Sequence, residues 1–335
     1  MQLDADQSQV NSVERRQPNL GLVCITVSNE VRYRTITRKR LLTFPLHEQS
    51  DILNELYLHN IGTLFKAVYF CGENNLRLYR ISSQIFPFAD EPVGIEVLSR
   101  LQDELRDIGK LANVRGLRLV VHPDQFVVLN SDSPEVVQNS IKILAMHART
   151  LDYLEQPRSP WSLLEIHGGK GKRAHELIAT IADLPDNIRT RLALENDEYI
   201  YSAAEILEVC RAASVPMVFD AHHHVCHEKI ESYADPSISY YIEAARTTWP
   251  TPEWQLAHIS NGREFFTDRR HHDLITDMPA AYRRIPWIEV EAKAKEVAIR
   301  KLQQEWLGMK TPQDHTADER IEDENAQTKP ARGEK

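Results

Sequence analysis

Eight short runs rich in β-branched and large apolar residues recur along the chain, and amphipathic stretches with helical spacing separate most of them. The runs cover 20–26, 78–82, 117–122, 162–168, 191–196, 217–222, 255–260 and 287–292. The helical stretches cover 46–60, 134–154, 173–182, 202–213, 237–247 and 293–306. Eight strand–helix units in this order predict an α/β fold, a parallel (β/α)8 TIM barrel. A doubly wound open sheet also alternates, but it usually has fewer units.

The predicted strands and helices span residues 20–306 of the 335. Single-domain α/β barrels of about 250 residues are common, so the length does not require a second domain. Residues 1–18 and 309–335 are polar or charged and nearly free of large apolar side chains. That composition is typical of disorder. We therefore expect one barrel domain at 19–308 between two disordered tails, at 1–18 and 309–335.

Composition also limits the cellular setting. No stretch approaches the ~20 apolar residues of a membrane span, and the first residues form no apolar signal region. Four cysteines lack paired spacing, which argues against a disulfide framework or a cysteine-based zinc site: Cys24, Cys71, Cys210 and Cys226. We expect reduced thiols in a cytoplasmic, nucleoid-associated protein with no membrane partner. The net charge of −9 argues weakly against a nucleic-acid partner, but metal-binding carboxylates and an acidic tail contribute to it.

Histidine and acidic side chains stand at the ends of six consecutive predicted strands. They are His122, then Glu165 and His167, then Glu195, then Asp220 with His222, His223 and His224, then His258, and finally Glu289 and Glu291. The C-terminal strand ends of a TIM barrel converge on one face, which carries the active site. Imidazole and carboxylate are the ligand set of zinc, manganese and iron. The sequence therefore predicts a metal centre on this face.

Spacing refines the ligand assignment. Asp220 and His223 stand three residues apart, where a turn after the strand can bring both to one ion. For His222 and His224, ligation and a supporting role remain equally open. Glu195 and Glu291 are candidates for bridging, since each carboxylate offers two oxygens. A cluster of two or three metals is the usual device for hydrolysing phosphate esters.

Basic residues gather in three of the predicted loops on the same face. They are Arg32, Arg34, Arg38, Lys39 and Arg40 after the first strand, Lys170, Lys172 and Arg173 after the fourth, and Arg263, Arg269 and Arg270 after the seventh. One such run usually marks a solvated surface. Three runs around a metal centre favour a polyanionic substrate, and we expect Arg34, Lys170, Lys172 and Arg263 to contact DNA.

The chain contains, in order, the segments LGLVC (20–24), RISSQIFPF (80–88), HPDQFVVLNS (122–131), IHGGKGK (166–172), LEND (194–197), FDAHHH (219–224), AHIS (257–260), HHD (271–273) and EAKAKE (291–296). Taken together, these segments make the chain resemble the UV damage endonuclease family over residues 20–307. The resemblance implies a TIM barrel related in architecture to endonuclease IV. It further implies hydrolysis of the phosphodiester 5′ to photoproducts and other lesions in duplex DNA. The expected cofactor is a divalent metal cluster, typically manganese, with Mg²⁺, Co²⁺ and Zn²⁺ as alternatives.

The resemblance assigns roles to individual positions. It implies metal ligands at His122, Glu195, Asp220, His223, His258, His271 and Glu291, and a histidine near the metals and the scissile phosphate at His167. We expect catalysis to depend on Glu195, His167 and Glu291. Gln125 and Phe126 match a pair that wedges into the duplex where damaged bases are flipped out, a role that suits a polar and an aromatic side chain. The expected oligomeric state is a monomer.

The chain departs from the family pattern at four positions. Leu22 and Thr26 replace a tyrosine and an asparagine, and Leu256 replaces a lysine that can bridge metals. A metal-binding histidine commonly follows the FPFA stretch, and either Asp90 or Glu91 is the candidate substitute here. These changes leave the metal count and the lesion range open. Two alternatives remain: a lesion-binding protein with weak or no cleavage, and a sugar isomerase or epimerase like xylose isomerase.

Overall fold

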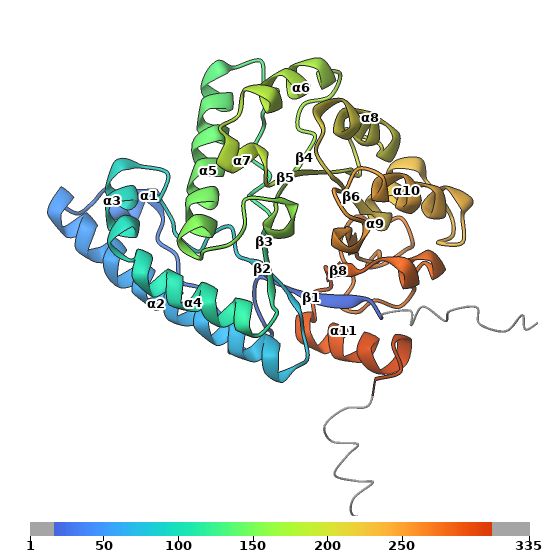
Figure 1. The fold of residues 1–335 in the computed structure, drawn as a ribbon, viewed down its shortest axis with the longest axis horizontal. Helices are drawn as coiled ribbons and strands as arrows, with labels where there is room; N and C mark the ends of the chain where they lie inside the picture. The colour runs from blue at the N-terminus through green and yellow to red at the C-terminus, as the bar shows by residue number, and fades with distance from the viewer. Residues whose placement is uncertain (1–16, 310–335) are drawn as a thin grey trace, which may run out of the picture.

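The computed structural model describes residues 17–309, and its centre is a closed barrel of eight parallel strands (Figure 1). The strands are β1 (Asn19–Val23), β2 (Leu78–Ile81), β3 (Arg118–Val121), β4 (Leu164–His167), β5 (Leu192–Glu195), β6 (Met217–Asp220), β7 (Leu256–Ile259) and β8 (Trp287–Val290). Each strand pairs with the next in sequence, and β8 pairs with β1. The predicted α/β (β/α)8 TIM barrel is confirmed, and the open sheet is excluded.

Helices surround the barrel. They are α1 (Arg38–Leu41), α2 (Leu46–Glu73), α3 (Pro92–Arg100), α4 (Gln102–Val114), α5 (Pro134–Tyr153), α6 (Ala174–Asp183), α7 (Asp186–Arg189), α8 (Ala203–Ala213), α9 (Ala221–Glu228), α10 (Pro236–Arg246) and α11 (Lys295–Lys301). The predicted set omitted α3 and α4 and ended α2 at residue 60. Yet α4 buries Leu105, Ile108 and Ala112, the spacing of a helix with one apolar face.

The N-terminal end of the barrel is closed by a buried arginine. Arg118, the first residue of β3, is inaccessible to solvent and donates to the backbone oxygens of Trp161 (2.7 Å), Trp254 (2.9 Å) and Pro160 (2.9 Å). Its guanidinium also lies against the Trp287 ring, 5.3 Å from the ring centroid. These contacts account for a fully buried cation, because charge-assisted hydrogen bonds replace its lost hydration.

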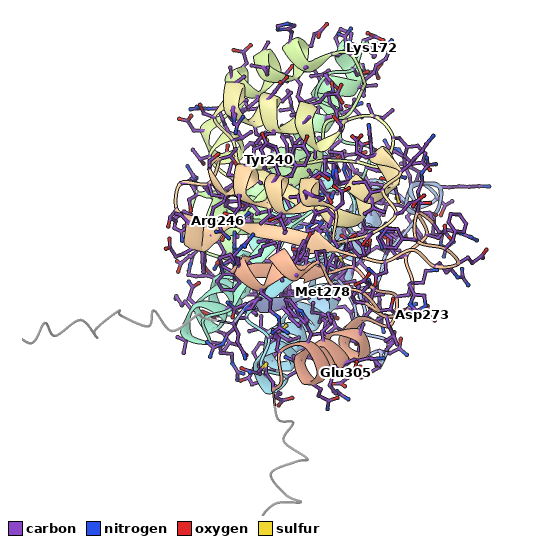
Figure 2. The ribbon with its side chains drawn as sticks, turned by 90° about the vertical axis from the view of Figure 1, so that its right-hand side faces the viewer. Lys172, Tyr240, Arg246, Asp273, Met278 and Glu305 are labelled. Carbon is purple, nitrogen blue, oxygen red and sulfur yellow. The ribbon has the colours of Figure 1, made fainter. Side chains whose placement is uncertain are left out.

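An apolar layer lies above this plug and contains Leu78, Val120, Ala193, Val218 and Leu256. Leu256, which stands where the resemblance leads us to expect a lysine, is therefore part of the packed barrel interior. The loops that follow the strands lie at the opposite end of the barrel from this layer. In Figure 2, Asp273, from the loop after β7, lies toward the right, and Arg246, at the end of α10, lies toward the left.

Three other expectations concern the chain as a whole. The four cysteines are unpaired, as predicted; Cys24 is partly exposed and the other three are buried. Within residues 17–309, no helix combines the length and the apolar character needed to cross a bilayer. The predicted tails, 1–18 and 309–335, lie outside the described residues apart from Gln17, Pro18 and Met309.

Candidate metal centre and its basic rim

Three overlapping groups of ligand side chains lie at the C-terminal ends of β3 to β8. They are His122, His167 and Glu195; Glu195, Asp220 and His223; and Asp220, His258 and Glu291. Within each group the ligand atoms lie within 4.8 Å of one another. Glu195 belongs to two groups, as expected for a bridging carboxylate. The other shared residue is Asp220, whereas Glu291, the second predicted bridge, belongs to one of these groups.

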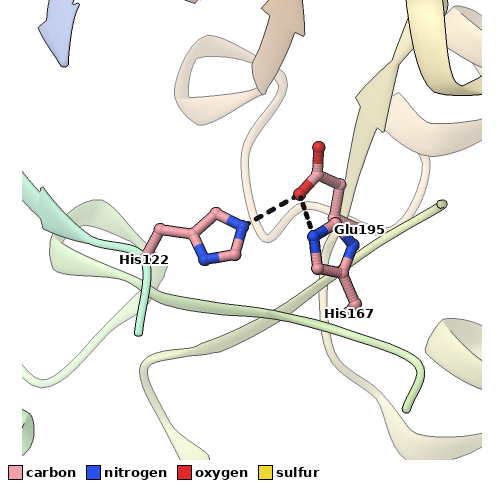
Figure 3. Close-up of side chains that lie close together, drawn as sticks. All are labelled: His122, His167 and Glu195. Atoms are coloured by element: carbon pink, nitrogen blue, oxygen red, sulfur yellow. Dashed lines mark hydrogen bonds and ion pairs between the residues drawn. The ribbon is translucent and has the colours of Figure 1, made fainter. Parts of the chain in front are cut away.

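Glu195 is at the centre of this cluster (Figure 3). Its Oε2 lies 3.0 Å from Nε2 of His122 and 3.6 Å from Nε2 of His167, and its Oε1 lies 3.0 Å from Nδ1 of His258. Burial alone would raise the pKa of Glu195, but the charges of His258, His167 and His223 hold that pKa well below its usual value. A lowered pKa favours the ionised form of Glu195, which is the form that ligates a metal.

Asp220 and His223 are brought together by the start of a helix. Asp220 ends β6 and is the N-cap of α9, where its Oδ1 accepts a hydrogen bond from the backbone N–H of His223 at 2.8 Å. The sequence predicted a loop here, but 221–228 is helical. The cap places the His223 ring 3.3 Å from Glu195. The second oxygen of Asp220 is buried and has no hydrogen-bond partner among the described residues.

Glu291 and His271 occupy the far side of the cluster. Glu291 lies 3.4 Å from Nδ1 of His258 and 3.8 Å from Nδ1 of His271, which belongs to none of the three groups. Arg80 on β2 also reaches Glu291, at 2.6 Å, and sequence reasoning missed it. Burial would raise the pKa of Glu291, but Arg80 and His258 lower it below its usual range. The sequence did contain a signal for Arg80, because it is the only charged residue in the apolar strand LYRI.

The remaining candidate ligands have other partners. His222 contacts the hydroxyl of Tyr233 at 3.0 Å and the backbone oxygen of Asp268 at 2.9 Å, and His224 contacts Ser237. Both therefore support the fold instead of joining the groups. Glu91, the candidate substitute ligand, forms an ion pair with Arg38 and belongs to none of the groups.

The donor set fits a cluster of divalent cations. Mixed imidazole and carboxylate ligands suit zinc, manganese and iron, and carboxylates can span two ions. The unpartnered oxygen of Asp220 adds a specific indication, because a buried carboxylate oxygen without a donor is costly unless a cation meets it. These residues could hold two or three ions in a continuous row.

The predicted DNA-binding residues lie in loops after β1, β3, β4 and β7. Phe126 is 71% exposed, and Gln125 beside it is also exposed. Lys170 forms an ion pair with Asp132, whereas Lys172 is exposed with no ion pair to a described residue. Arg263 is exposed, and Arg34 lines a cavity of about 310 Å³ together with Lys295.

Two further exposed aromatic rings lie in loops that follow strands and were not predicted. Tyr199 follows β5 and is 58% exposed, and the guanidinium of Arg269 lies 3.6 Å from its ring centroid. Phe265 follows β7 and is 60% exposed. Aromatic residues within polar loops were the only sequence signal. Together with Phe126, they give this end of the barrel three exposed aromatic side chains among basic ones.

Comparison with known proteins gives a consistent family. Residues 18–318 match the family described as UV-endonuclease UvdE. The chain is 57% identical over 293 residues to the UV DNA damage endonuclease of Nostoc sp. strain PCC 7120, covering 87% of this chain and 91% of the relative. It is 50% identical over 285 residues to the UV DNA damage endonuclease of Deinococcus radiodurans, covering 84% of this chain and 93% of the relative.

Solved structures support the fold alone. The crystal structure of SacUVDE gives a TM-score of 0.73 at 24% identity and covers 87% of this chain and 100% of that one. A D-tagatose 3-epimerase-like protein gives a TM-score of 0.52 at 10% identity, covering 87% of this chain and 97% of that one. At such low identity, the second likeness carries no information about the reaction.

Proposed function

The chain belongs to the UV-endonuclease family, and from this premise we propose that it is a metal-dependent DNA repair endonuclease. Its substrate is duplex DNA, cut at the phosphodiester 5′ to UV photoproducts and other lesions. Two relatives at 57% and 50% identity bear the name UV DNA damage endonuclease and match over most of their length. The observation that carries the proposal is the row of ligand groups joined by Glu195 and Asp220.

The cluster and the surrounding loops divide the work. Bound divalent ions, manganese in our proposal, supply Lewis acidity toward the phosphoryl oxygen and lower the pKa of a water. The carboxylates of Glu195 and Asp220 hold the positive charge in a buried site. In this proposal His167, at the partly exposed edge of its group, orients the scissile phosphate. Lys172 and Arg263 hold neighbouring phosphates and fix the register of the strand.

Recognition of the lesion follows from the exposed side chains on the same face. Flipping a base out of the duplex costs least free energy when that base is already damaged or poorly paired. This difference in cost contributes to selectivity for lesions. Phe126 can stack on an orphaned base, and Gln125 can hydrogen-bond to its edge. One face meets the duplex, so we propose that the protein acts as a monomer.

A nicking assay tests this function directly. Supercoiled plasmid, irradiated or not, is incubated with the full chain and Mn²⁺, alongside EDTA and the Glu195→Ala variant. We expect nicking of irradiated plasmid only, lost with EDTA and in Glu195→Ala, and kept in Glu305→Ala, which removes a carboxylate beyond α11 and outside the ligand groups. Equal nicking of both plasmids, or nicking that survives EDTA, would contradict the proposal.

A second candidate rests on Leu256. Its apolar side chain cannot bridge metals as the family's lysine can, which favours a lesion-binding protein with weak cleavage. That protein would bind irradiated duplex in preference to intact duplex but leave it uncut across Mn²⁺, Mg²⁺, Co²⁺ and Zn²⁺. The alternative function, a sugar epimerase, gives no reason for the exposed basic and aromatic side chains around the cluster.

A further inference from the structure

Two buried carboxylates lie one layer beneath the metal-ligand groups. Glu165 precedes His167 by two residues on β4, and Glu289 precedes Glu291 by two on β8. Side chains two apart on a strand point to the same face, so both carboxylates enter the barrel interior below the rim. Both are inaccessible to solvent. The sequence placed them on the rim with the ligands, and their depth gives them a different role.

His258 connects the two layers. Its Nδ1 faces upward, 3.0 Å from Oε1 of Glu195 and 3.4 Å from Oε1 of Glu291. Its Nε2 faces downward, 3.1 Å from Oε2 of Glu165 and 2.9 Å from Oε2 of Glu289. A neutral imidazole carries one proton, so a ring that ligates through Nδ1 must carry that proton on Nε2. The lower carboxylates lie within reach of that proton, although neither contact is aligned as a hydrogen bond in the structure.

One other histidine of the cluster, His122, shows the same division. Its Nδ1 lies 2.9 Å from the backbone oxygen of Pro123 while its Nε2 faces Glu195. In the His122 ring, the carbonyl acceptor fixes the proton on Nδ1. For His258 the acceptors are carboxylates, which hold the proton more strongly than a carbonyl does.

We propose that Glu165 and Glu289 are positioning residues that accept the Nε2 proton of His258 and so keep the Nδ1 lone pair directed at the metal centre. The inference rests on the proposed metal dependence. Arg80 supports it from the side, with Nη1 2.9 Å from Glu289 and Nη2 2.6 Å from Glu291. Arg80 thereby balances charge in both layers and fixes Glu289 beneath the ring.

The same residues could instead form a separate metal site, since Glu165, His258 and Glu289 offer ligand atoms within 4.8 Å. One observation opposes this. His258, whose Nδ1 already faces Glu195 and Glu291, would have to ligate through both nitrogens and lose its last ring proton. Glu165 makes its only ion pair among the described residues with His258, which makes it the cleaner residue to change.

The test is metal binding by the chelator-stripped full chain, measured by calorimetric titration with Mn²⁺. We expect Glu165→Leu, which keeps the volume but removes the acceptor, to bind Mn²⁺ roughly 10- to 100-fold more weakly. Glu165→Gln retains a carbonyl acceptor and should stay within a few-fold of wild type. The matched control is Glu296→Gln, a buried carboxylate on α11 that accepts from the backbone N–H groups of Val27 and Ser28. It should bind Mn²⁺ as wild type does.

Wild-type affinity in Glu165→Leu would overturn the inference. So would the loss of one whole equivalent of metal with the others unchanged, because that result identifies a separate metal site. A second measurement needs no variant: long-range ¹H–¹⁵N spectra of the Zn²⁺-loaded wild type. We expect His258 to carry its proton on Nε2, and a proton on Nδ1 would contradict the proposal. Neither readout uses DNA, so a protein that binds metal but does not nick would fail only the proposed function.

Discussion

Substitutions of the proposed wedge pair, Gln125 and Phe126, should change affinity for damaged DNA without changing the stability of the fold. Phe126 is 71% exposed in the loop after β3, and Gln125 is exposed beside it. Because exposed side chains contribute little to folding, we expect Phe126→Ala to change the free energy of unfolding by less than ~0.5 kcal/mol. Stacking of an aromatic ring on a base contributes ~1–3 kcal/mol. Affinity for damaged duplex should therefore fall roughly 5- to 150-fold.

The measurement is fluorescence anisotropy with two duplexes of identical sequence, one carrying a single photoproduct. We expect Phe126→Ala, and more strongly the double variant with Gln125→Ala, to reduce the ratio between the two dissociation constants. Mn²⁺ affinity and melting temperature should stay unchanged. Tyr240→Ala is the matched control, because Tyr240 is 61% exposed but lies on α10, on the outer wall of the barrel (Figure 2). It should leave both affinities as they are.

Two results would refute the reasoning. An unchanged ratio of dissociation constants would mean that damaged bases are recognised elsewhere. A loss of Mn²⁺ affinity as large as the loss of damaged-DNA affinity would mean that the substitutions act on His122, the ligand a few residues earlier in the chain. In that case the pair supports the metal site and is not the wedge.

Three further predictions follow from buried or charged groups elsewhere. Arg118→Met leaves three partly buried carbonyl oxygens without their donor. At ~1–3 kcal/mol each, partly offset by relief of the buried charge, we expect the free energy of unfolding in urea to fall by about 3 kcal/mol. An unchanged midpoint would contradict this, and the exposed Arg158→Met is the control. Burial lowers the pKa of His147 to about 4. An unfolded histidine titrates near 6.5, so below that pH the unfolded chain takes up a proton that the folded protein does not. The free energy of unfolding is therefore unaffected by His147 above pH 6.5 and falls by up to ~3 kcal/mol toward pH 4. His147→Met should flatten that part of the pH–stability curve, whereas the exposed His47→Met should not. Lys172→Ala should reduce the slope of log affinity against log salt by about one, equally for damaged and intact DNA; Lys170→Ala should reduce it less, because Lys170 already pairs with Asp132. Equal effects of the two lysines would show that the ion pair opens on DNA.

The sequence alone determined the barrel and the kind of side chain at its rim. Eight alternating units leave few arrangements other than a closed parallel sheet, and closure brings the strand ends to one face whatever the details of packing. Chain order and side-chain type place His122, Glu195, Asp220, His258 and Glu291 at that face, since each stands at a strand end. Their selection as metal ligands from among the rim residues came from the resemblance to the family.

Tertiary structure decided which neighbouring side chains complete the site. Glu165 and Glu289 read as rim residues in the sequence, but they lie one layer lower, under His258. Arg80 joins both layers from a strand with no other sign of function. The tilt and stagger of the closed barrel set the depth of each side chain relative to other strands, and a single strand's pattern does not contain that information.

Long-range partners settled the remaining alternatives. His222 is held by Tyr233 and Asp268, and Glu91 is held by Arg38. Asp268 and Arg38 are distant from these residues in the sequence, and Tyr233 lies beyond the end of the helix that carries His222. Asp220 belongs to two of the ligand groups, and as the N-cap of α9 it is held beside His223. Local sequence thus specifies which side chains can ligate, whereas contacts between distant segments determine which ones have their oxygen and nitrogen atoms free to do so.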